Sequence, residues 1–435
     1  MLCFYRKIYY VFATIVTLTL SITVYQIYLV QFDKTLYQSE VPIILWWTPF
    51  GNDGKLRECG NDRCYFTSNR SFQYHKHIKS ILFYGSNIQI HDLPSWKSDE
   101  ISWGLLHEES PRNNPVLVHQ EALNLFTYSS TFSRFSDVPL TLVDFPGITA
   151  LLDRKYFVST EEKTRLIRTK NLAPLLYVQS NCDTASNRDI YISELMKYIR
   201  VDSYGKCLNN AQFEERLKKN YLEKLNSKDF LSFIANYKFT IAFENAVCDD
   251  YITEKLWRPL IVGSIPVYYG SPSFKDWLPN NMSAISVRDF KDPISLANFI
   301  QNLSNNETEY NKYLSHKLVD GYEIDNEKLR KALEKNKLIF NEFGSYVEEF
   351  ECFVCKHVQS QRETKMIDKK HYNCPLPKNP LTNKIDRSNW WTKQWILEKC
   401  TAKILSDYLQ NNFTINMESF EKTKMKFYRE NECYI

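Results

Sequence analysis

The sequence lacks the short motifs that mark several large classes of phosphate-binding and metal-dependent enzymes. It contains no Gly-x-Gly-x-x-Gly and no Gly-x-x-x-x-Gly-Lys-Ser/Thr stretch, which argues against a dinucleotide fingerprint and a P-loop. It has no Asp-x-Asp triplet to hold a divalent ion on a nucleotide diphosphate, and no His-Glu-x-x-His zinc motif. Internal repeats and low-complexity tracts are absent too. A binding site must therefore be sought in less familiar patterns.

A strong excess of one charge is also missing. The chain has 55 basic and 51 acidic residues, for a net charge of only +4. This balance gives no electrostatic reason to expect a nucleic-acid partner. A hydrophobic content of 43% and a charged content of 24% are typical of a folded globular protein. At 435 residues the chain is too long for one ordinary core, so two domains are expected.

The cysteines and glycosylation sequons indicate a secretory compartment. Of eleven cysteines, Cys3 precedes a long apolar segment and the other ten, an even number, follow it. Ten cysteines together with several sequons favour disulfide bonds in an oxidising lumen. The candidate glycosylation sites are the five sequon asparagines Asn69, Asn281, Asn302, Asn306 and Asn412.

The pairing of the cysteines does not follow from the sequence. Two pairs are close enough to form local bridges, Cys59 with Cys64 and Cys352 with Cys355. The second pair would also suit a zinc half-site or a redox site, but a lumenal location favours structural disulfides. Five of the cysteines lie in residues 346–435, which we predict to be a disulfide-stapled C-terminal extension.

The N-terminus carries a candidate membrane anchor. Residues 8–30 contain no charge, and 23 residues are enough to cross about 30 Å of hydrocarbon as a helix. Arg6 and Lys7 precede the segment, so the positive-inside rule places residues 1–7 in the cytosol. Residues 31–40 would then be a short stem. The alternative is a cleaved signal peptide, but the apolar run is longer than a signal core. We predict a single-pass type II membrane protein.

Alternating strands and helices are predicted over residues 41–170. Buried-strand patterns occur at residues 42–48, 80–84 and 101–106. The third leads to Glu109, which is followed by Ser110-Pro111, a pair that favours an extended turn. A carboxylate at the end of a strand is placed to act as a general base. The alternative is an ordinary surface glutamate in a loop.

A second alternating run is predicted over residues 171–345. A strand at 175–178 is followed by Ser180 and Asn181, and a helix is expected over 188–200. The central strand, residues 239–243, precedes Asn245. In α/β sheets, ligands bind at the carboxyl ends of the strands, beside helix N-termini.

The most informative helix of this run follows that strand. Its apolar positions from Ile252 to Ile261 recur at three- and four-residue spacing, and Gly263 ends it before a strand at 265–269. Glu254 and Lys255 stand at its start. Lys255 and Arg188 could hold a diphosphate. The alternative is a solvated helix face on which Glu254 pairs with Arg258.

Three of these stretches resemble the donor-binding signature of the α1,3-fucosyltransferases, glycosyltransferase family 10. They are Phe243-Glu244-Asn245, Asp250 to Leu256, and Gly263 to Val267. Further similar segments are Glu109-Ser110-Pro111, Ser133 to Asp137, Ser180-Asn181 and Ser203-Tyr204-Gly205. The resemblance covers about residues 41–345. It implies a GT-B fold, in which two Rossmann-like domains face each other across the active site.

The resemblance also implies roles for individual residues. Glu109 would be the general base on the acceptor hydroxyl, and Arg188 and Lys255 would bind the diphosphate of GDP-fucose. The rest of the donor pocket would comprise Asn245, Tyr251, Glu254, Ser180, Asn181 and Tyr204. The reaction would be one inverting displacement that converts a β-linked donor to an α-fucoside. Two fixed cations can stabilise the GDP leaving group without a metal, which agrees with the missing Asp-x-Asp, so no cofactor is expected.

The sequence around Glu109 bears on the acceptor. Residues 108–114, 256–259 and 270–281 resemble a divergent branch, the tenth and eleventh vertebrate members, described as protein O-fucosyltransferases acting on Ser or Thr of EMI domains. The sequence on either side of Glu109-Ser110-Pro111 differs from that of the family members that act on lactosamine glycans. The differing residues are His107-Glu108 before it and Arg112-Asn113-Asn114 after it. Alternatives are α1,3-fucosylation of GlcNAc on N-glycans and a non-catalytic lumenal GDP-fucose- or glycan-binding protein. The resemblance implies residence in the Golgi or endoplasmic reticulum.

Overall fold

The computed structural model describes residues 40–50, 54–94, 97–98, 100–145, 147–218, 227–342, 344–360, 365–411, 413 and 415–433. The predicted cytosolic tail and membrane segment, residues 31–39 of the predicted stem, and Asn412 lie outside the described residues. Within those ranges, no helix combines the length and the hydropathy required to cross a bilayer.

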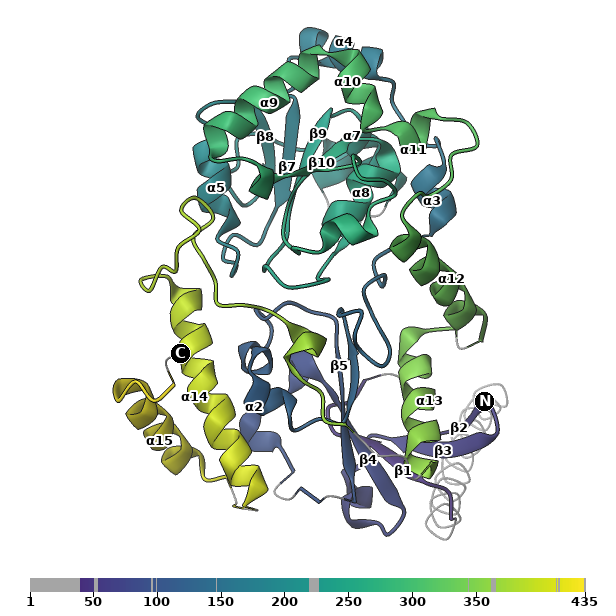
Figure 1. Cartoon of the computed structure of the whole chain (residues 1–435), viewed down its shortest axis with the longest axis vertical. Helices are drawn as coiled ribbons and strands as arrows, with labels where there is room; N and C mark the ends of the chain where they lie inside the picture. Colours follow the sequence, from purple (N-terminus) through teal and green to yellow (C-terminus); the bar gives the residue numbers. More distant parts are fainter. Residues whose placement is uncertain are drawn as a thin grey trace, which may run out of the picture.

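The chain forms two α/β units that lie one above the other along the long axis (Figure 1). The first is built on a six-stranded sheet of order β2-β3-β1-β4-β5-β6, in which only the β2–β3 pair is antiparallel. Its strands are β1 (Ile43–Trp46), β2 (Lys55–Cys59), β3 (Asp62–Thr67), β4 (Ile78–Tyr84), β5 (Ser102–His107) and β6 (Tyr128–Thr131).

The second unit is built on a five-stranded parallel sheet of order β11-β10-β9-β7-β8. Its strands are β7 (Leu175–Gln179), β8 (Val201–Gly205), β9 (Phe239–Phe243), β10 (Ile265–Tyr269) and β11 (Ile285–Ser286). In a parallel sheet all carboxyl ends lie at one edge, so the loops after β7, β9 and β10 are neighbours. The mixed α/β fold predicted from the strand patterns is confirmed.

Helices cover both faces of the second sheet (Figure 1). The helices α7 (Lys228–Ala235) and α8 (Glu254–Val262) share one apolar cluster, and α5 (Arg188–Leu195) and α9 (Pro293–Asn305) share the other. The helix predicted over 188–200 ends earlier than expected, since α5 ends at Leu195. Gly263 ends α8 in the left-handed region with φ of 71°, as the sequence predicts, and Asp292 caps α9 ahead of Pro293.

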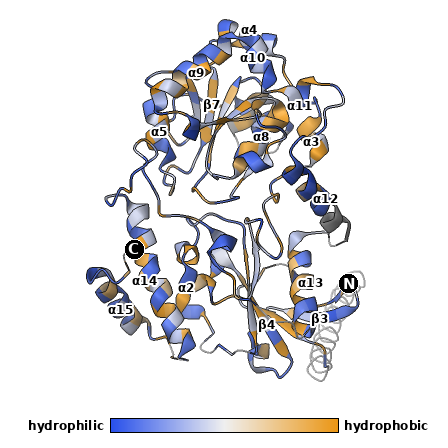
Figure 2. Ribbon diagram, in the orientation of Figure 1, coloured by the Kyte–Doolittle hydropathy of each residue, from blue (hydrophilic) through white to orange (hydrophobic). Residues whose placement is uncertain are grey.

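The C-terminal stretch covers the first sheet. Its helices are α13 (Tyr346–Gln359), α14 (Trp390–Gln410) and α15 (Met417–Arg429). Successive side chains of a strand point to opposite faces, and on β1 Ile44 packs in the cluster that contains Phe350 of α13, whereas Leu45 packs in the cluster that contains Leu405 of α14. Residues 346–435 thus supply a covering helix to each face. Two helices at the periphery, α12 (Glu327–Glu342) and α15, consist mainly of hydrophilic residues (Figure 2).

The remaining helices are short or lie at the periphery. They are α2 (Gln120–Leu123), α3 (Ile148–Leu152), α4 (Thr160–Thr169), α6 (Glu215–Lys218), α10 (Glu307–Lys312) and α11 (Ser315–Leu318).

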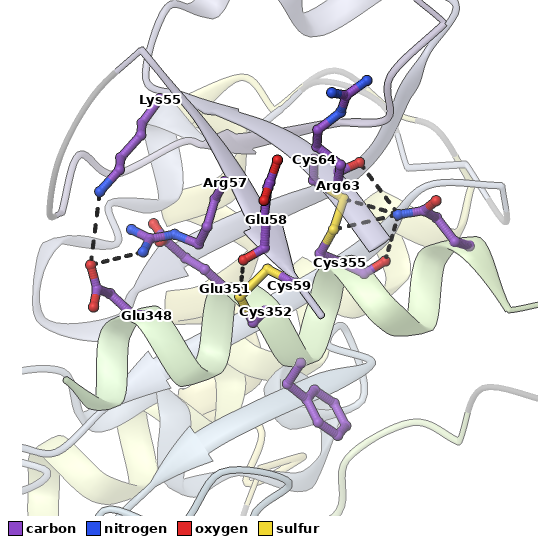
Figure 3. Close-up of a disulfide and its surroundings, with 12 residues drawn as sticks. Lys55, Arg57, Glu58, Cys59, Arg63, Cys64, Glu348, Glu351, Cys352 and Cys355 are labelled. Atoms are coloured by element: carbon purple, nitrogen blue, oxygen red, sulfur yellow. Dashed lines mark hydrogen bonds and ion pairs between the residues drawn. A yellow bond between two sulfur atoms is a disulfide. The ribbon is translucent and has the colours of Figure 1, made fainter. Parts of the chain in front are cut away.

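All ten cysteines of the described residues are paired, which confirms the predicted disulfides, but the predicted local pairs are wrong. Cys59 bonds to Cys352 and Cys64 bonds to Cys355 (Figure 3). The physical reason is that α13 packs on the β2–β3 hairpin, so two cysteines three residues apart on one helix face each meet a cysteine of the hairpin. The other disulfides are Cys182–Cys207, Cys248–Cys374 and Cys400–Cys433.

Charged contacts support the same interface between α13 and the hairpin (Figure 3). Arg57 of β2 lies 2.8 Å from both Glu348 and Glu351, the latter almost fully buried. This network and the two disulfides fix the position of α13 on the first sheet.

Four of the predicted glycosylation sites lie in the described residues, and each asparagine is exposed. They are Asn69, Asn281, Asn302 and Asn306. Their modification stays a prediction.

Candidate active site

The loop between β9 and α8 is held by a buried carboxylate. Glu244 is fully buried, and its two oxygens accept hydrogen bonds from the backbone N–H (2.9 Å) and the hydroxyl (2.8 Å) of Thr253. Burial raises the pKa of Glu244, and the ammonium of Lys255, 3.6 Å away, acts in the opposite direction. Glu244 lies in the Phe243-Glu244-Asn245 stretch, but the sequence pattern indicates no role for it. It closes the loop that carries Asn245 and Tyr251.

Lys255 and Glu254 lie at the N-terminus of α8. The Lys255 ammonium donates to the hydroxyl of Thr253 at 3.0 Å and lies 3.3 Å from the carboxylate of Glu254. Arg258 also reaches Glu254 at 3.3 Å, which confirms the pair predicted by the alternative reading. Burial opposes ionisation of Glu254, but the two cations outweigh it and lower its pKa to about 2. The group is thus charged at neutral pH.

This helix start is not a solvated surface. Only 13% of the Lys255 side chain and 27% of that of Glu254 are exposed. Both line a cavity of about 90 Å³ together with Gln179 and Ser180 at the end of β7. The buried hydroxyl of Ser180 has no hydrogen-bond partner among the described residues. A helix N-terminus with a lysine and an unpartnered hydroxyl is suited to bind an anionic ligand.

Arg188 joins the ends of two strands. It is fully buried at the start of α5, and its Nη1 donates to the carbonyl of Phe243 (2.8 Å) and the side chain of Asn245 (2.9 Å). Its Nη2 donates to the side chain of Gln179 (2.8 Å) and the carbonyl of Asn181 (2.7 Å). All four Nη hydrogens therefore have protein acceptors, and the arginine brings the loops after β7 and β9 together.

Glu109 approaches this group from the first unit. It lies two residues after β5, and its carbonyl accepts a hydrogen bond from the hydroxyl of Tyr372 at 2.7 Å. Burial raises the pKa of Glu109, the neighbouring Glu108 raises it further, and Lys255 opposes both. The carboxylate is therefore within electrostatic range of Lys255. Residues from the two units meet at this point.

The two predicted tyrosines differ in position. Tyr251 is almost fully buried, and its ring centroid lies 5.1 Å from that of Phe132, in the apolar cluster of the first unit. Tyr204 is 8% exposed, its ring stacks on Phe213 at 4.7 Å, and its hydroxyl lies 3.1 Å from that of Tyr237. Tyr251 thus belongs to the boundary between the units, whereas Tyr204 belongs to the core of the second unit.

An ion pair between the units was not predicted. Arg134, after β6, donates from Nε (2.8 Å) and Nη2 (2.6 Å) to Asp250, which is 1% exposed, and also reaches Asp276 at 2.7 Å. Both Arg134 and Asp250 occur in the stretches that resemble the family. The resemblance could have indicated that both residues matter. Their pairing could not be predicted from sequence spacing, because they are 116 positions apart.

Among the described residues, one group of side chains is close enough together to be considered as metal ligands: Cys182, Asp189 and Cys207. Because the two cysteines form a disulfide, neither offers a thiolate to a metal.

Two sheets whose carboxyl-end loops meet, with a carboxylate on one side and a cationic helix N-terminus on the other, define an α/β enzyme with its site between the units. Comparison with known proteins then identifies the family. The model for "Fucosyltransferase, N-terminal" matches residues 38–142, and the model for "Glycosyltransferase family 10 (fucosyltransferase) C-term" matches residues 167–372.

Several similar proteins carry fucosyltransferase names. A GDP-fucose protein O-fucosyltransferase 3 of Xenopus laevis is 41% identical over 90% of this chain and 86% of its own length, and that of Homo sapiens is 44% identical over 77% and 71%. An alpha-(1,3)-fucosyltransferase B of Drosophila melanogaster is 38% identical over 93% and 92%. The chain belongs to glycosyltransferase family 10, the fucosyltransferases, and is a GDP-fucose-dependent glycosyltransferase.

Among solved structures, an alpha1,3-fucosyltransferase with GDP-fucose matches with a TM-score of 0.40 and 20% identity, over 70% of this chain and 92% of the other. Family membership confirms the resemblance found in the sequence and disfavours the non-catalytic alternative.

Proposed function

We propose that this chain transfers fucose from GDP-fucose to a Ser or Thr hydroxyl of a folded, EMI-type protein domain. The names of the relatives in Xenopus laevis and Homo sapiens support a protein acceptor. The second candidate is α1,3-fucosylation of GlcNAc on N-glycans, and the name of the Drosophila melanogaster relative, an alpha-(1,3)-fucosyltransferase matched over 92% of its length, supports its α1,3 linkage.

The observation that carries the proposal is that the partly buried Glu109 of the first unit lies within electrostatic range of Lys255 at the N-terminus of α8 in the second unit. The Glu109 carboxylate takes the proton of the acceptor hydroxyl as that oxygen attacks C1 of fucose. The bond from C1 to the diphosphate oxygen breaks, and GDP leaves with the electron pair on the opposite face. One displacement of this kind inverts the β-linked donor to an α-fucoside. The raised pKa of Glu109 makes it a stronger base than an exposed glutamate.

The donor site is assigned to the loops after β7 and β9. Lys255 and the N-terminus of α8 stabilise the negative charge that grows on GDP. We expect Ser180, Asn181, Asn245 and Glu254 to complete the binding surface. The resemblance also assigns Tyr251 and Tyr204 to the donor pocket, although Tyr204 packs in the core of the second unit. Arg188 holds these loops through its four Nη hydrogens, and its buried Nε–H, which has no hydrogen-bond partner among the described residues, is the donor left for a diphosphate contact. We infer that fixed cations replace a metal, so no cofactor is needed.

The two units correspond in this proposal to the facing Rossmann-like domains of a GT-B enzyme. Five disulfides support an oxidising compartment. We infer a type II membrane protein of the Golgi or endoplasmic reticulum, anchored by residues 8–30 with its catalytic part in the lumen.

A transfer assay tests the proposal. The full chain is incubated with GDP-fucose and a purified EMI domain, with EDTA in a parallel sample, and modified peptides are identified by mass spectrometry. We expect fucose on Ser or Thr, with the same rate in EDTA. Transfer to N-glycan acceptors alone would reject the protein acceptor, and loss of activity in EDTA would reject the metal-free mechanism.

A further inference from the structure

A second cavity of about 400 Å³ lies beside the candidate active site. It shares no lining residue with the smaller cavity at Lys255. Pro111, two residues after Glu109, forms part of one wall, and Ala246 and Val247, which follow Asn245, form part of another. The cavity therefore opens next to the acceptor side of the site, while the donor residues lie outside it.

One wall of this cavity comes from the C-terminal stretch. Residues 374–378 and 380–383 line it, with Trp391 and Trp395 of α14. The family model ends at residue 372, so this wall lies beyond the region that the model matches. We call the cavity the proline-walled pocket because Pro375, Pro377 and Pro380 belong to it.

The wall is fixed to the second unit before any ligand binds. Cys374 bonds to Cys248 in the loop after β9. The neighbouring Asn373 side chain donates to the carboxylate of Asp249 at 2.6 Å, and Asp249 N–H donates to the carbonyl of Asn373 at 3.0 Å. The Trp395 indole N–H donates to the carbonyl of Cys374 at 3.4 Å. A wall held this way loses little conformational entropy on binding.

The lining of the proline-walled pocket indicates what it would hold. Tyr191 is 3% exposed, and its buried hydroxyl has no hydrogen-bond partner among the described residues, so it is available to a ligand. Three exposed cations, Arg288, Lys291 and Lys378, line the pocket with a single carboxylate, Asp292. Apolar walls with a cationic rim suit a peptide segment that carries an apolar side chain and negative charge.

We propose that the proline-walled pocket binds an acidic segment of the acceptor protein next to the modified Ser or Thr, and that it sets acceptor choice. This inference rests on the proposed protein acceptor. The apolar side chain of the segment enters among the prolines, its carboxylates face Lys291 and Lys378, and a polar group accepts from Tyr191.

Charge reversal at the rim tests the proposal. The full-length Lys291→Glu/Lys378→Glu variant is compared with wild type for KM of the EMI domain, KM of GDP-fucose, and hydrolysis of GDP-fucose without acceptor. We expect the acceptor KM to rise about tenfold, with a weaker salt dependence, while both donor measurements stay unchanged. Lys312→Glu, a charge reversal on α10 away from the pocket, is the matched control and should leave all three values unchanged.

Tyr191→Phe provides a second variant that keeps the shape of the pocket. It should raise the acceptor KM a few-fold, and it should not lower the unfolding temperature because the lost hydroxyl has no partner in the free protein. An unchanged acceptor KM in both variants would overturn the inference while leaving the proposed function intact, and so would a rise in the KM of GDP-fucose. If wild type transfers no fucose to protein, the proposed function fails and the inference fails with it.

Discussion

The ion pair between Arg134 and Asp250 should be one of the strongest links between the two units. Asp250 is 1% exposed and accepts hydrogen bonds from the backbone N–H of Arg134 (3.0 Å), its guanidinium, the hydroxyl of Ser273 (2.6 Å) and the indole N–H of Trp277 (3.1 Å). Replacing Arg134 with leucine leaves the carboxylate buried with its main counter-charge removed. Breaking one side of such a pair costs about 3–5 kcal/mol.

Two further variants separate the lost charge pair from lost packing. Asp250→Asn retains hydrogen-bonding atoms and tolerates the left-handed backbone at this position, where φ is 62°. The double variant Arg134→Leu/Asp250→Asn no longer buries a charge, so it should be more stable than Arg134→Leu alone. A coupling free energy of about 1–3 kcal/mol is expected for the cycle.

The assay is urea and thermal unfolding of the four proteins at several pH values. Burial alone would raise the pKa of Asp250, but hydrogen bonds from Arg134 and Ser273 outweigh it, and the folded-state pKa is lowered. The stabilisation is therefore fully present above the unfolded-state pKa of about 3.9 and is lost as the pH falls through the lower folded-state value. An Arg134→Leu change of less than about 1 kcal/mol at pH 7, or an additive double variant, would refute the reasoning.

Three more predictions concern the site and the disulfides. Glu109→Gln should lower the transfer rate by about 10²–10⁴-fold with little change in the KM of GDP-fucose. In wild type the transfer rate should fall as the pH drops through the raised pKa of Glu109. Steady-state kinetics across pH should show that the variant lacks this fall in rate at low pH. Lys255→Met should raise the KM of GDP-fucose and lower kcat, while the Lys312→Glu control does neither; an unchanged donor KM, measured by initial rates, would contradict the assigned contact. Replacing both Cys64 and Cys355 with serine should cost about 2–3 kcal/mol in chemical unfolding, because their bond closes a further short ring in the unfolded chain beside the intact Cys59–Cys352 bond. An equally stable variant would show that α13 does not need this second bond.

The sequence predicts those parts of the fold that depend on neighbouring residues. The apolar run at residues 239–243 forms a strand with the predicted bounds, and Gly263 ends the following helix as expected. The pattern does not reveal β6, because its residues Ser129, Ser130 and Thr131 are polar although fully buried. Their burial is compensated by side-chain hydrogen bonds, such as that from Ser130 to the carbonyl of Val138. A pattern of hydrophobic residues in the sequence cannot reveal such bonds.

The candidate site shows the same division. Lys255 and Asn245 could be placed at a ligand edge because each lies directly beside a predicted strand or helix end. The surroundings of Arg188 could not be predicted, because its hydrogen-bond partners are carbonyls and side chains at the ends of two strands, up to 57 positions away in the sequence. Sequence spacing could suggest a cation for the diphosphate, but only the structure shows that its Nη hydrogens are already satisfied by protein acceptors.

If the proline-walled pocket binds the acceptor, the position of the C-terminal stretch makes stability and acceptor choice depend on the same residues. Since α13 covers one face of the first sheet and α14 the other, the chain between them must pass around the sheet. It runs past both ends of β6: Ile367 N–H donates to the carbonyl of Phe126 (3.0 Å) before the strand, and the hydroxyl of Ser133, after the strand, donates to the carbonyl of Lys370 (2.7 Å). It then crosses the boundary between the units (Figure 1).

This path leads directly past the candidate base. Tyr372 reaches the backbone of Glu109, and Cys374, two residues later, is bonded to the loop after β9. A segment that must cross here to complete the core is thereby available to shape the acceptor side. Substitutions between residues 374 and 383 should therefore alter acceptor preference more than donor binding, whereas truncation before α14 would also uncover one face of the first sheet and unfold it. Point variants, rather than deletions, are the experiments that can separate the two roles.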